Sequence, residues 1–434
     1  MDIAYTKTTL ANGLDVIIHE DHTLPIVAVN VWYHVGSKDE RPGLTGFAHL
    51  FEHLMFEGSA NHDHGYFPPL QDAGAAVNGS TNADRTNYWE VVPTGALELA
   101  LFLESDRMGF LLPALTEKKF TTQREVVINE RRQNYENRPY GLAGIAMTTA
   151  LYPSDHPYHW PTIGYTPDLR LATLDDVRDF FARHYHPGNA SIALAGDIDP
   201  ASALALVERY FGELPTGPPV PRVEVPTGGL AGETRIVLED RVDRPRLYIA
   251  WRTPALFEDG DAALDVAADV IASGKTSRLY RTLVHERRLA LDVSGGQQSR
   301  ELEGFFQLAS TAAPGRTLAD IEAVITEALG ELAANGPTDA ELERALAQAE
   351  AAFVYRLQTV GGFSGKSDQL NAYNVYRGDP GSFDADLARY TRLTKADVRD
   401  AVRRLAARPR VALSVVPNGA GDQALAGSVT AVAS

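Results

Sequence analysis

The chain has 434 residues, of which 44% are hydrophobic and 22% are charged, and these values are typical of a globular protein with more than one domain. Its formal net charge of −17 at pH 7 argues against nucleic acid or an anionic membrane surface as a partner. The chain contains no cysteine, which excludes disulfide bonds, thiolate metal ligands and a cysteine nucleophile. A zinc site in this chain must therefore use histidine and carboxylate ligands.

The first half of the chain alternates predicted strands with predicted helices. Strands are expected at 14–18 and 26–33, which are rich in β-branched and aromatic residues. A helix at 44–56 comes next, followed by a strand pair at 73–81 and 86–92. The remaining elements of this half are expected to be helices at 96–108, 117–137, 175–185 and 201–211 and a strand at 190–196. This order predicts an α/β (α+β) fold, with β-sheet packed by helices.

The expected helix at 44–56 carries the residues with the clearest chemistry. Its apolar side chains recur at the three- and four-residue steps of a packed helix: Phe47, Leu50, Phe51, Leu54 and Met55. His49 and His53 are one turn apart and share a face with Glu52. Two neutral imidazoles at this spacing can hold one zinc ion, and a carboxylate beside a zinc-bound water can take its proton. The order His-x-x-Glu-His is that of the inverzincins.

The alternative interpretation of this segment is a helix with two incidental histidines. That interpretation leaves Glu52 unexplained, because a carboxylate in so apolar a segment usually marks a metal, a charge pair or a reaction.

A proline-rich stretch separates the two halves of the chain. Residues 212–232 hold five prolines among several glycines, which is the composition of an interdomain linker. We therefore expect a first domain at 1–214, a linker at 215–232 and a second domain at 233–434.

The second half repeats the first at a nearly constant offset. Val16–Asp21 is echoed at Ile236–Arg241, an offset of 220, and Thr173–Asp179 is echoed at Thr394–Asp400, an offset of 221. Offsets that agree at both ends of a half predict two homologous domains related by internal duplication.

The repeat also provides an internal control on the histidine motif. At the offset of 220, the positions of His49, Glu52 and His53 are taken in the second half by Asp269, Ala272 and Ser273. The duplicated architecture thus does not require these residues, which favours a chemical role for them in the first half.

A two-histidine site needs a third protein ligand, and a carboxylate is expected in a chain without cysteine. In the expected helix at 117–137, Glu130 lies on the same helical stripe as the apolar Phe120 and Val127. Glu125 and Glu136 lie on the solvated faces. Glu130 is therefore the candidate third ligand.

With these residues in place, the chain resembles the pitrilysin and mitochondrial-processing-peptidase family of zinc peptidases, whose signature is His-x-x-Glu-His with a glutamate 77 positions after the second histidine. Glu130 stands at that position. The resemblance implies one zinc ion per chain, bound by His49, His53 and Glu130, with Glu52 as the catalytic base. It also implies that an edge strand beside the site binds the substrate as an added strand, through these residues: Val77, Asn78, Gly79, Ser80 and Thr81.

The chain departs from the family pattern at two places. Many members have a glutamate seven positions before the third ligand, where this chain has Gln123, and we expect that residue to act just outside the metal ligands. In the second half, the family's arginine and tyrosine that help to hold the substrate are replaced by Val284 and Leu291. The resemblance therefore implies a homologous partner subunit that supplies the missing arginine and tyrosine.

Together these features predict a zinc endopeptidase that is the catalytic subunit of a heterodimer, in a clam-shell assembly with the second subunit. A non-enzymatic scaffold and a peptide-binding subunit that keeps zinc for structure are the alternatives. No apolar run approaches the ~20 residues of a membrane span. The absence of cysteine and a first strand that begins almost at once, with no visible signal peptide, lead us to expect a periplasmic protein, with the cytoplasm as the alternative.

Overall fold

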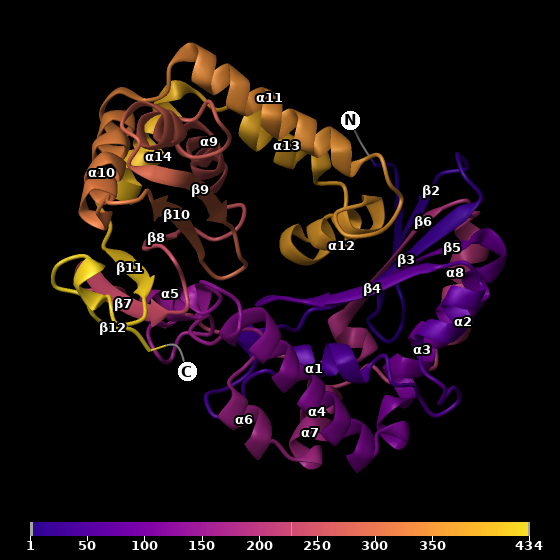
Figure 1. The fold of residues 1–434 in the computed structure, drawn as a ribbon. Helices are drawn as coiled ribbons and strands as arrows, with labels where there is room; N and C mark the ends of the chain where they lie inside the picture. Colours follow the sequence, from indigo (N-terminus) through magenta and orange to yellow (C-terminus); the bar gives the residue numbers. More distant parts are fainter. Residues whose placement is uncertain (1–2, 227, 433–434) are drawn as a thin grey trace. The chain divides into compact units, whose positions relative to one another are not determined.

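The computed structural model describes residues 3–226 and 228–432, which form two compact units (Figure 1). The first unit comprises the residues up to 129 together with 160–224 and 353–385. The second comprises 130–159, 225–352 and the residues from 386 on. Each unit is built around its own six-stranded sheet.

The first sheet has the strand order β1-β2-β6-β3-β5-β4. Its strands are β1 (Thr6–Thr9), β2 (Asp15–Glu20), β6 (Ala190–Gly196), β3 (Ile26–Tyr33), β5 (Thr86–Pro93) and β4 (Ala76–Thr81). β2 and β6 are parallel, and the other neighbours are antiparallel. β4 is the last strand in this order, so one of its sides is an edge of the sheet.

Helices cover both faces of the first sheet. On one face lie α1 (Phe47–Leu54), α3 (Leu97–Ala114) and α8 (Pro200–Phe211), with α7 (Leu174–His184) packed against α1. The other face is covered over β2, β6 and β3 by α12 (Lys366–Arg377). The remaining helices before the linker are α2 (Phe67–Asp72), α4 (Glu117–Arg131), α5 (Ala143–Leu151) and α6 (Thr166–Leu171).

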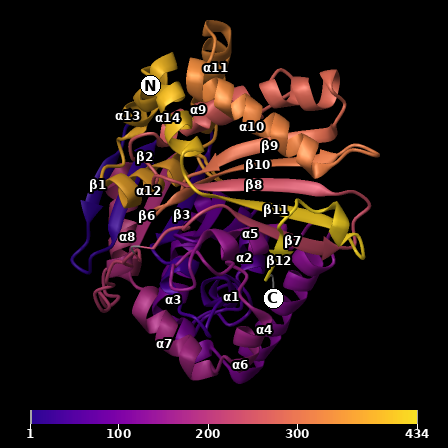
Figure 2. The ribbon, with the colours of Figure 1, turned by 90° about the vertical axis from the view of Figure 1, so that its left-hand side faces the viewer.

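The second sheet repeats this order as β12-β7-β11-β8-β10-β9, and Figure 2 shows its strands side by side. Its strands are β12 (Val429–Thr430), β7 (Thr234–Asp240), β11 (Arg410–Pro417), β8 (Arg246–Thr253), β10 (Gly304–Ala312) and β9 (Ala290–Gln298). β7 and β11 are parallel, as their counterparts β2 and β6 are. The predicted fold, two homologous sheets packed with helices, is confirmed.

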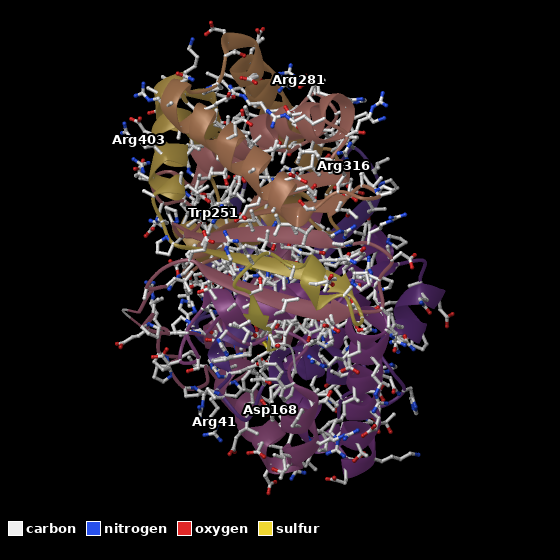
Figure 3. The ribbon with its side chains drawn as sticks, turned by 60° about the vertical axis from the view of Figure 1, so that its left-hand side comes forward. Arg41, Asp168, Trp251, Arg281, Arg316 and Arg403 are labelled. Carbon is white, nitrogen blue, oxygen red and sulfur yellow. The ribbon has the colours of Figure 1, made fainter. Side chains whose placement is uncertain are left out.

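The core of the second unit lies between its sheet and α9 (Asp261–Ile271), α10 (Leu318–Asn335) and α14 (Lys395–Ala406). Figure 3 shows Trp251 of this core within the strand layer, while Arg281, Arg316 and Arg403 lie at the surface. The other helices are α11 (Asp339–Arg356) and α13 (Phe383–Thr391). None of the helices within the described residues is both long and apolar enough to cross a membrane.

The same capping box begins α7 in the first half of the sequence and α14 in the second. Thr173 and Asp176 exchange hydrogen bonds at the start of α7, and Thr394 and Asp397 do so at the start of α14. In each case the threonine hydroxyl accepts from a backbone N–H of the first turn, and the aspartate accepts from the threonine N–H. The sequence similarity between residues 173–179 and 394–400 therefore reflects the same kind of helix start in both halves.

The two compact units differ from the predicted domains, 1–214 and 233–434, because each half of the sequence has a segment that packs in the other unit. Residues 130–159, with helix α5, pack in the second unit, where α5 contacts β11, β8 and β7. Residues 353–385, with helix α12, pack in the first unit. α5 and α12 follow the corresponding long helices α4 and α11, so each half of the sequence contributes an equivalent helix to the other half's unit.

Candidate metal centre

Helix α1 presents one face to the core and another to the candidate metal ligands. Phe47, Leu50, Phe51 and Leu54 are buried, as the apolar spacing predicted. His49, Glu52 and His53 are half-buried. Because α1 is fixed by its apolar face, its polar face is presented in one orientation.

The start of α1 is held by a glycine contact and by a buried carboxylate. Gly46 has a φ of 89°, and a Cβ at this residue would lie 2.9 Å from the carbonyl oxygen of Ile163, so the position requires glycine. Glu40 accepts hydrogen bonds from the backbone N–H groups of Gly46 and Ala48, at 2.9 Å each. Burial raises the pKa of Glu40 well above its usual value, although these backbone hydrogen bonds favour the charged form.

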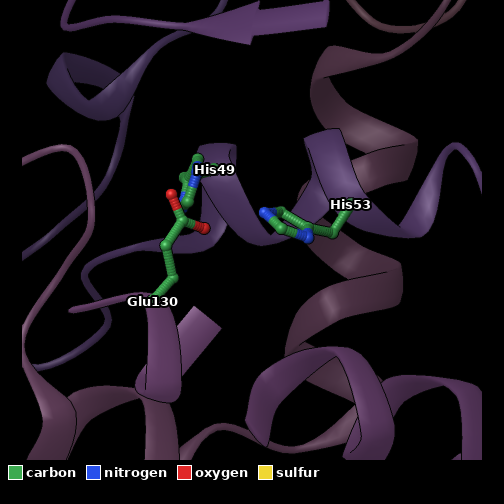
Figure 4. Close-up of side chains that lie close together, drawn as sticks. All are labelled: His49, His53 and Glu130. Atoms are coloured by element: carbon green, nitrogen blue, oxygen red, sulfur yellow. The ribbon is translucent and has the colours of Figure 1, made fainter. Parts of the chain in front are cut away.

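Three side chains meet at the polar face of α1 (Figure 4). His49, His53 and Glu130 each offer a ligand atom, and these atoms all lie within 4.8 Å of one another. The two imidazole rings have centroids 4.9 Å apart and are nearly perpendicular, at 82°. Glu130 lies in the last turn of α4, where the helix passes into a π-helical turn over Arg132–Glu136.

This donor set fits a zinc ion. Two imidazoles and one carboxylate form a common three-ligand set of catalytic zinc sites, which leave a further position for water or substrate. Asn134 in the π-helical turn donates a hydrogen bond to Glu130 Oε1 at 3.3 Å, which orients the carboxylate. Among the residues that the structure describes, this is the group of histidines and carboxylates close enough together to hold a metal.

Glu52 lies on the same helix face and contacts strand β4. The hydroxyl of Thr81 donates a hydrogen bond of 2.7 Å to Glu52 Oε2. This contact was not anticipated, because the sequence placed Thr81 only in the substrate strand. A threonine at the end of an edge strand gives no sequence signal for a contact with a residue 29 positions earlier.

Buried tyrosines surround the carboxylate of Glu52. Tyr88 and Tyr185 are fully buried, and burial raises the pKa of both phenols, with the charge of Glu52 adding to the effect. Both phenols therefore stay neutral. The rings of Phe51 and Tyr185 pack at a tilt of 33°, with centroids 5.1 Å apart, and this contact connects Tyr185 to α1.

Gln123 was expected to act just outside the metal ligands. In the structure, Gln123 Nε2 donates a hydrogen bond to Glu57 Oε1 at 2.7 Å. Glu57 follows α1, so this hydrogen bond links α4 to the segment that leaves the motif helix.

The expected substrate strand is β4, and its outer side is unpaired in the sheet order. Val77, Asn78, Gly79, Ser80 and Thr81 all lie within it. Gly79 packs closely against Phe56, since a Cβ there would lie 3.1 Å from the Phe56 ring. The strand is thereby held near the end of α1.

The corresponding helix of the second unit lacks the metal-binding residues. Asp269, Ala272 and Ser273 lie in or directly after α9, and Asp269 is hydrogen-bonded to Ser273. Val284 is partly buried against the core of the second unit, and Leu291 in β9 is 53% exposed.

Comparison with known families gives two matches along the chain. Residues 15–152 match the family described as insulinase (peptidase family M16). Residues 172–349 match the family described as the peptidase M16 inactive domain. The division agrees with the presence of the histidine motif in the first half and its absence from the second.

Curated relatives are similar over most of their length. The zinc protease PqqE of Helicobacter pylori is 29% identical over 83% of this chain and 82% of its own. An uncharacterized zinc protease of Mycobacterium tuberculosis is 28% identical over 96% of this chain and 94% of its own.

Solved structures share the fold over nearly the whole chain. The crystal structure of a Helicobacter pylori protease matches with a TM-score of 0.88 and 26% identity, over 96% of this chain and 100% of that one. An M16 inactive-domain protein of Pseudomonas fluorescens matches with a TM-score of 0.84 and 20% identity, over 99% of this chain and 100% of that one. At that identity the second likeness concerns the fold alone.

Proposed function

The chain belongs to the insulinase family of peptidases, family M16, and on this basis we propose that it is a zinc endopeptidase that cleaves peptides or small unfolded proteins. The main support for this proposal is that the ligand atoms of His49, His53 and Glu130 lie within 4.8 Å of one another. Glu52 lies on the same helix, α1, as the two histidines. The names of the curated relatives support zinc as the ion.

Each polar side chain of the centre has a role in this reaction. His49, His53 and Glu130 would hold one zinc ion, which when bound supplies a Lewis acid that activates water and polarises a carbonyl. Glu52 accepts a proton from the attacking water and then donates it to the leaving amine. Thr81 fixes the direction of the Glu52 carboxylate through its hydroxyl.

We propose that the substrate binds as an added strand along β4. The unpaired side of this strand offers backbone N–H and C=O groups to an extended peptide, and such pairing tolerates many sequences. Thr81, at one end of β4, contacts Glu52, so a peptide on this edge passes the catalytic base.

We also propose that the chain is the catalytic subunit of a heterodimer with a homologous chain, whose arginine and tyrosine take the place of Val284 and Leu291. The neighbouring Arg287 is paired with Glu327 at 2.9 Å, which supports a partner rather than Arg287 as the source of the guanidinium. Activity should be weak for either chain alone and should rise when the two are mixed. Full activity of this chain by itself would refute the heterodimer.

The second candidate function is a non-enzymatic scaffold or a peptide-binding subunit of the same family. The replacement of the family's arginine and tyrosine by Val284 and Leu291 favours it. In that case Glu52 would be dispensable for the protein's role.

Zinc analysis combined with a cleavage assay tests the proposed function. The purified chain should contain one zinc ion, and it should cleave an unstructured peptide with its partner present. Glu52→Gln should keep the zinc but lose cleavage by a factor of at least about 10²–10⁴. Bound zinc with no cleavage by the wild-type chain, alone or with its partner, would favour the scaffold.

For the compartment we propose the periplasm, with the cytoplasm as the alternative. Support comes from the periplasmic protease PqqL of Escherichia coli, whose structure shares this fold with a TM-score of 0.80 at 19% identity. Fractionation of cells that express the full gene, with a known periplasmic protein as the control, distinguishes the two compartments.

A further inference from the structure

The first unit contains an apolar cavity on the face of its sheet opposite α1. The cavity has a volume of about 560 Å³, within the range of ligand-binding pockets. Its apolar lining consists of Leu24, Ile26, Ala76, Trp89, Val91, Leu357 and Val360. All of these residues belong to the first unit.

The register of the strands explains why the sheet is open here. Ala76 pairs with Val91, Asn78 with Trp89, and Ser80 with Asn87, so these pairs share one face. Helix α12 covers this face at Asn87, which donates a hydrogen bond to Asp368 at 3.3 Å. Trp89 and Val91 lie further along β5 and line the cavity instead.

A loop between α11 and α12 forms the other wall of the cavity. Residues 357–362 line it, and Gly361 seats this loop directly on the sheet. A Cβ at Gly361 would lie 2.5 Å from Ala28 Cβ and 2.6 Å from Val91 Cγ2, so a larger residue would lift the loop. The close contact of Gly361 with the sheet therefore fixes the position of this wall.

The chemistry of the cavity favours an apolar group attached to a hydrogen-bonding backbone. Its two charged lining residues, Asp21 and Lys366, pair with each other at 2.6 Å, so the lining carries no net charge. Trp89 Nε1 is buried without a hydrogen-bond partner among the described residues, and such a donor is costly unless an acceptor is supplied. Two apolar side chains of the same region are exposed, Leu24 at 59% and Phe363 at 47%.

The cavity adjoins the strand that we expect to receive the substrate. A peptide added to β4 directs every second side chain to the face of Ala76, Asn78 and Ser80. Of these three residues, Ala76 is the one that lines the cavity. Thr81 contacts Glu52 at the other end of the strand, five positions away, or roughly 17 Å along an extended chain.

We propose that this cavity is a specificity subsite, which binds a large apolar side chain of the peptide substrate about five residues from the scissile bond. The inference rests on the proposed strand addition along β4. Selection at this distance would let the enzyme recognise a segment of sequence while the main-chain pairing near the scissile bond stays tolerant.

The test measures peptide binding separately from cleavage. A single phenylalanine is moved one position at a time along an otherwise polar peptide, and each peptide is titrated against the zinc-loaded Glu52→Gln protein by calorimetry. One position, about five residues from the bond that the wild-type enzyme cleaves, should bind at least about tenfold more tightly than the same peptide with alanine there.

A variant with a filled cavity supplies the control. Leu357→Trp should abolish this preference for phenylalanine, whereas Leu171→Trp, the same change at a 74% exposed residue of α6, should keep it. If the wild-type enzyme cleaves the peptides but none differs from its alanine form, the subsite is refuted while the proposed function stands. Selective binding without cleavage would support the subsite and count against the peptidase. Absence of both binding and cleavage refutes the subsite as well.

A second copy of the chain is the competing occupant of the cavity. If the wild-type protein elutes as a dimer and Leu357→Trp elutes as a monomer, the cavity is a dimer contact and the inference is overturned.

Discussion

The two sheets of this chain have the same strand order, yet the helices α1 and α9, at equivalent places in the repeat, carry different chemistry. α1 carries His49, Glu52 and His53, whereas the equivalent positions of the second half are Asp269, Ala272 and Ser273. Asp269 and Ser273 bond to each other. The comparison indicates that the repeated architecture does not require the three residues of the histidine motif.

Helix α12 of the first unit and helix α5 of the second cover equivalent faces of the two sheets. In the first unit the contact is polar and buried, with Asp368 of α12 accepting hydrogen bonds from side chains of β3 and β5. The apolar cluster of the second unit lies on the other face of its sheet, against α9, α10 and α14. A substitution at Asp368 therefore tests whether the face under α12 depends on polar contacts.

The largest expected effect comes from Glu130, the proposed third metal ligand. Glu130→Gln should remove most of the zinc, because the amide replaces the anionic ligand of the set, and cleavage should fall with it by more than about 10³-fold. Metal analysis and a peptide assay measure the two losses. Full zinc occupancy in the variant would mean that another residue is the ligand.

Glu125→Gln is the matched control, since Glu125 is an exposed glutamate of the same helix. It should keep both zinc and activity. Equal losses of zinc and activity in both variants would show that any charge change in α4 disturbs the centre. The experiment would then give no support to the difference in chemistry between α1 and α9.

The second prediction concerns the polar tie of the first unit. Asp368→Ala should lower the free energy of unfolding of this unit by about 3 kcal/mol, because it leaves buried donors without an acceptor. The donors to Asp368 include Trp32 Nε1 at 3.0 Å and the Ser364 N–H at 2.7 Å. Urea unfolding followed by tryptophan fluorescence measures the change.

Asp72→Ala, at an exposed aspartate of α2 in the same unit, is the control and should change the stability by less than about 0.5 kcal/mol. An Asp368→Ala protein as stable as this control would show that the polar contacts of Asp368 do not stabilise the packing of α12.

Local patterns in the sequence predicted much of this architecture. The strands at 26–33 and 190–196 were predicted at their observed bounds, the first of them from its β-branched and aromatic residues. The apolar spacing of α1 and of the stripe through Glu130 put the three candidate ligands on faces that do meet. The equal offsets of the repeat anticipated two sheets of the same order.

Other features depend on contacts that no local pattern encodes. Helices α5 and α12 each pack on the sheet of the other half, and a repeat in sequence does not say which copy of a sheet a helix will cover. The buried Glu40 supports the start of α1, yet a single glutamate in a loop has no signature. The family resemblance led us to expect Gln123 just outside the metal ligands, but no sequence pattern indicated its hydrogen bond to Glu57.

The third prediction concerns pH and the second unit. Burial raises the pKa of Asp265 in α9 to about 7, with the charges of Asp261 and Asp269 adding to the effect. Since the folded chain holds this proton more tightly than the unfolded chain, where the pKa is near 3.8, the contribution to stability is full below pH 4 and is lost as the pH rises to 7.

Asp265→Asn should remove this dependence, because asparagine keeps an oxygen for the Tyr390 hydroxyl, which donates at 2.7 Å, but carries no charge. The stability of the variant relative to wild type should increase between pH 4 and pH 8 by about 4 kcal/mol, measured by urea unfolding. Asp259→Asn, at a side chain that is 97% exposed, should show no such change with pH. A flat difference for Asp265→Asn would mean that this carboxyl is ionised in the fold.

The smallest expected effect distinguishes two possible roles of Thr81, which lies in the proposed substrate strand and also contacts the proposed catalytic base, Glu52. Thr81→Val removes the hydroxyl that donates to Glu52 Oε2 at 2.7 Å while it keeps the branched shape of the side chain. If the hydroxyl positions Glu52, kcat should fall about tenfold, since one hydrogen bond to a charged group contributes roughly 1.5–3 kcal/mol and part of it is replaced by water. KM should change little, because the backbone that pairs with the peptide is untouched. Thr81→Ser restores the hydroxyl and should recover most of kcat, which a loss of strand structure would not allow. A rise in KM at constant kcat in Thr81→Val, with no recovery in Thr81→Ser, would assign Thr81 to substrate binding alone and leave Glu52 oriented by α1.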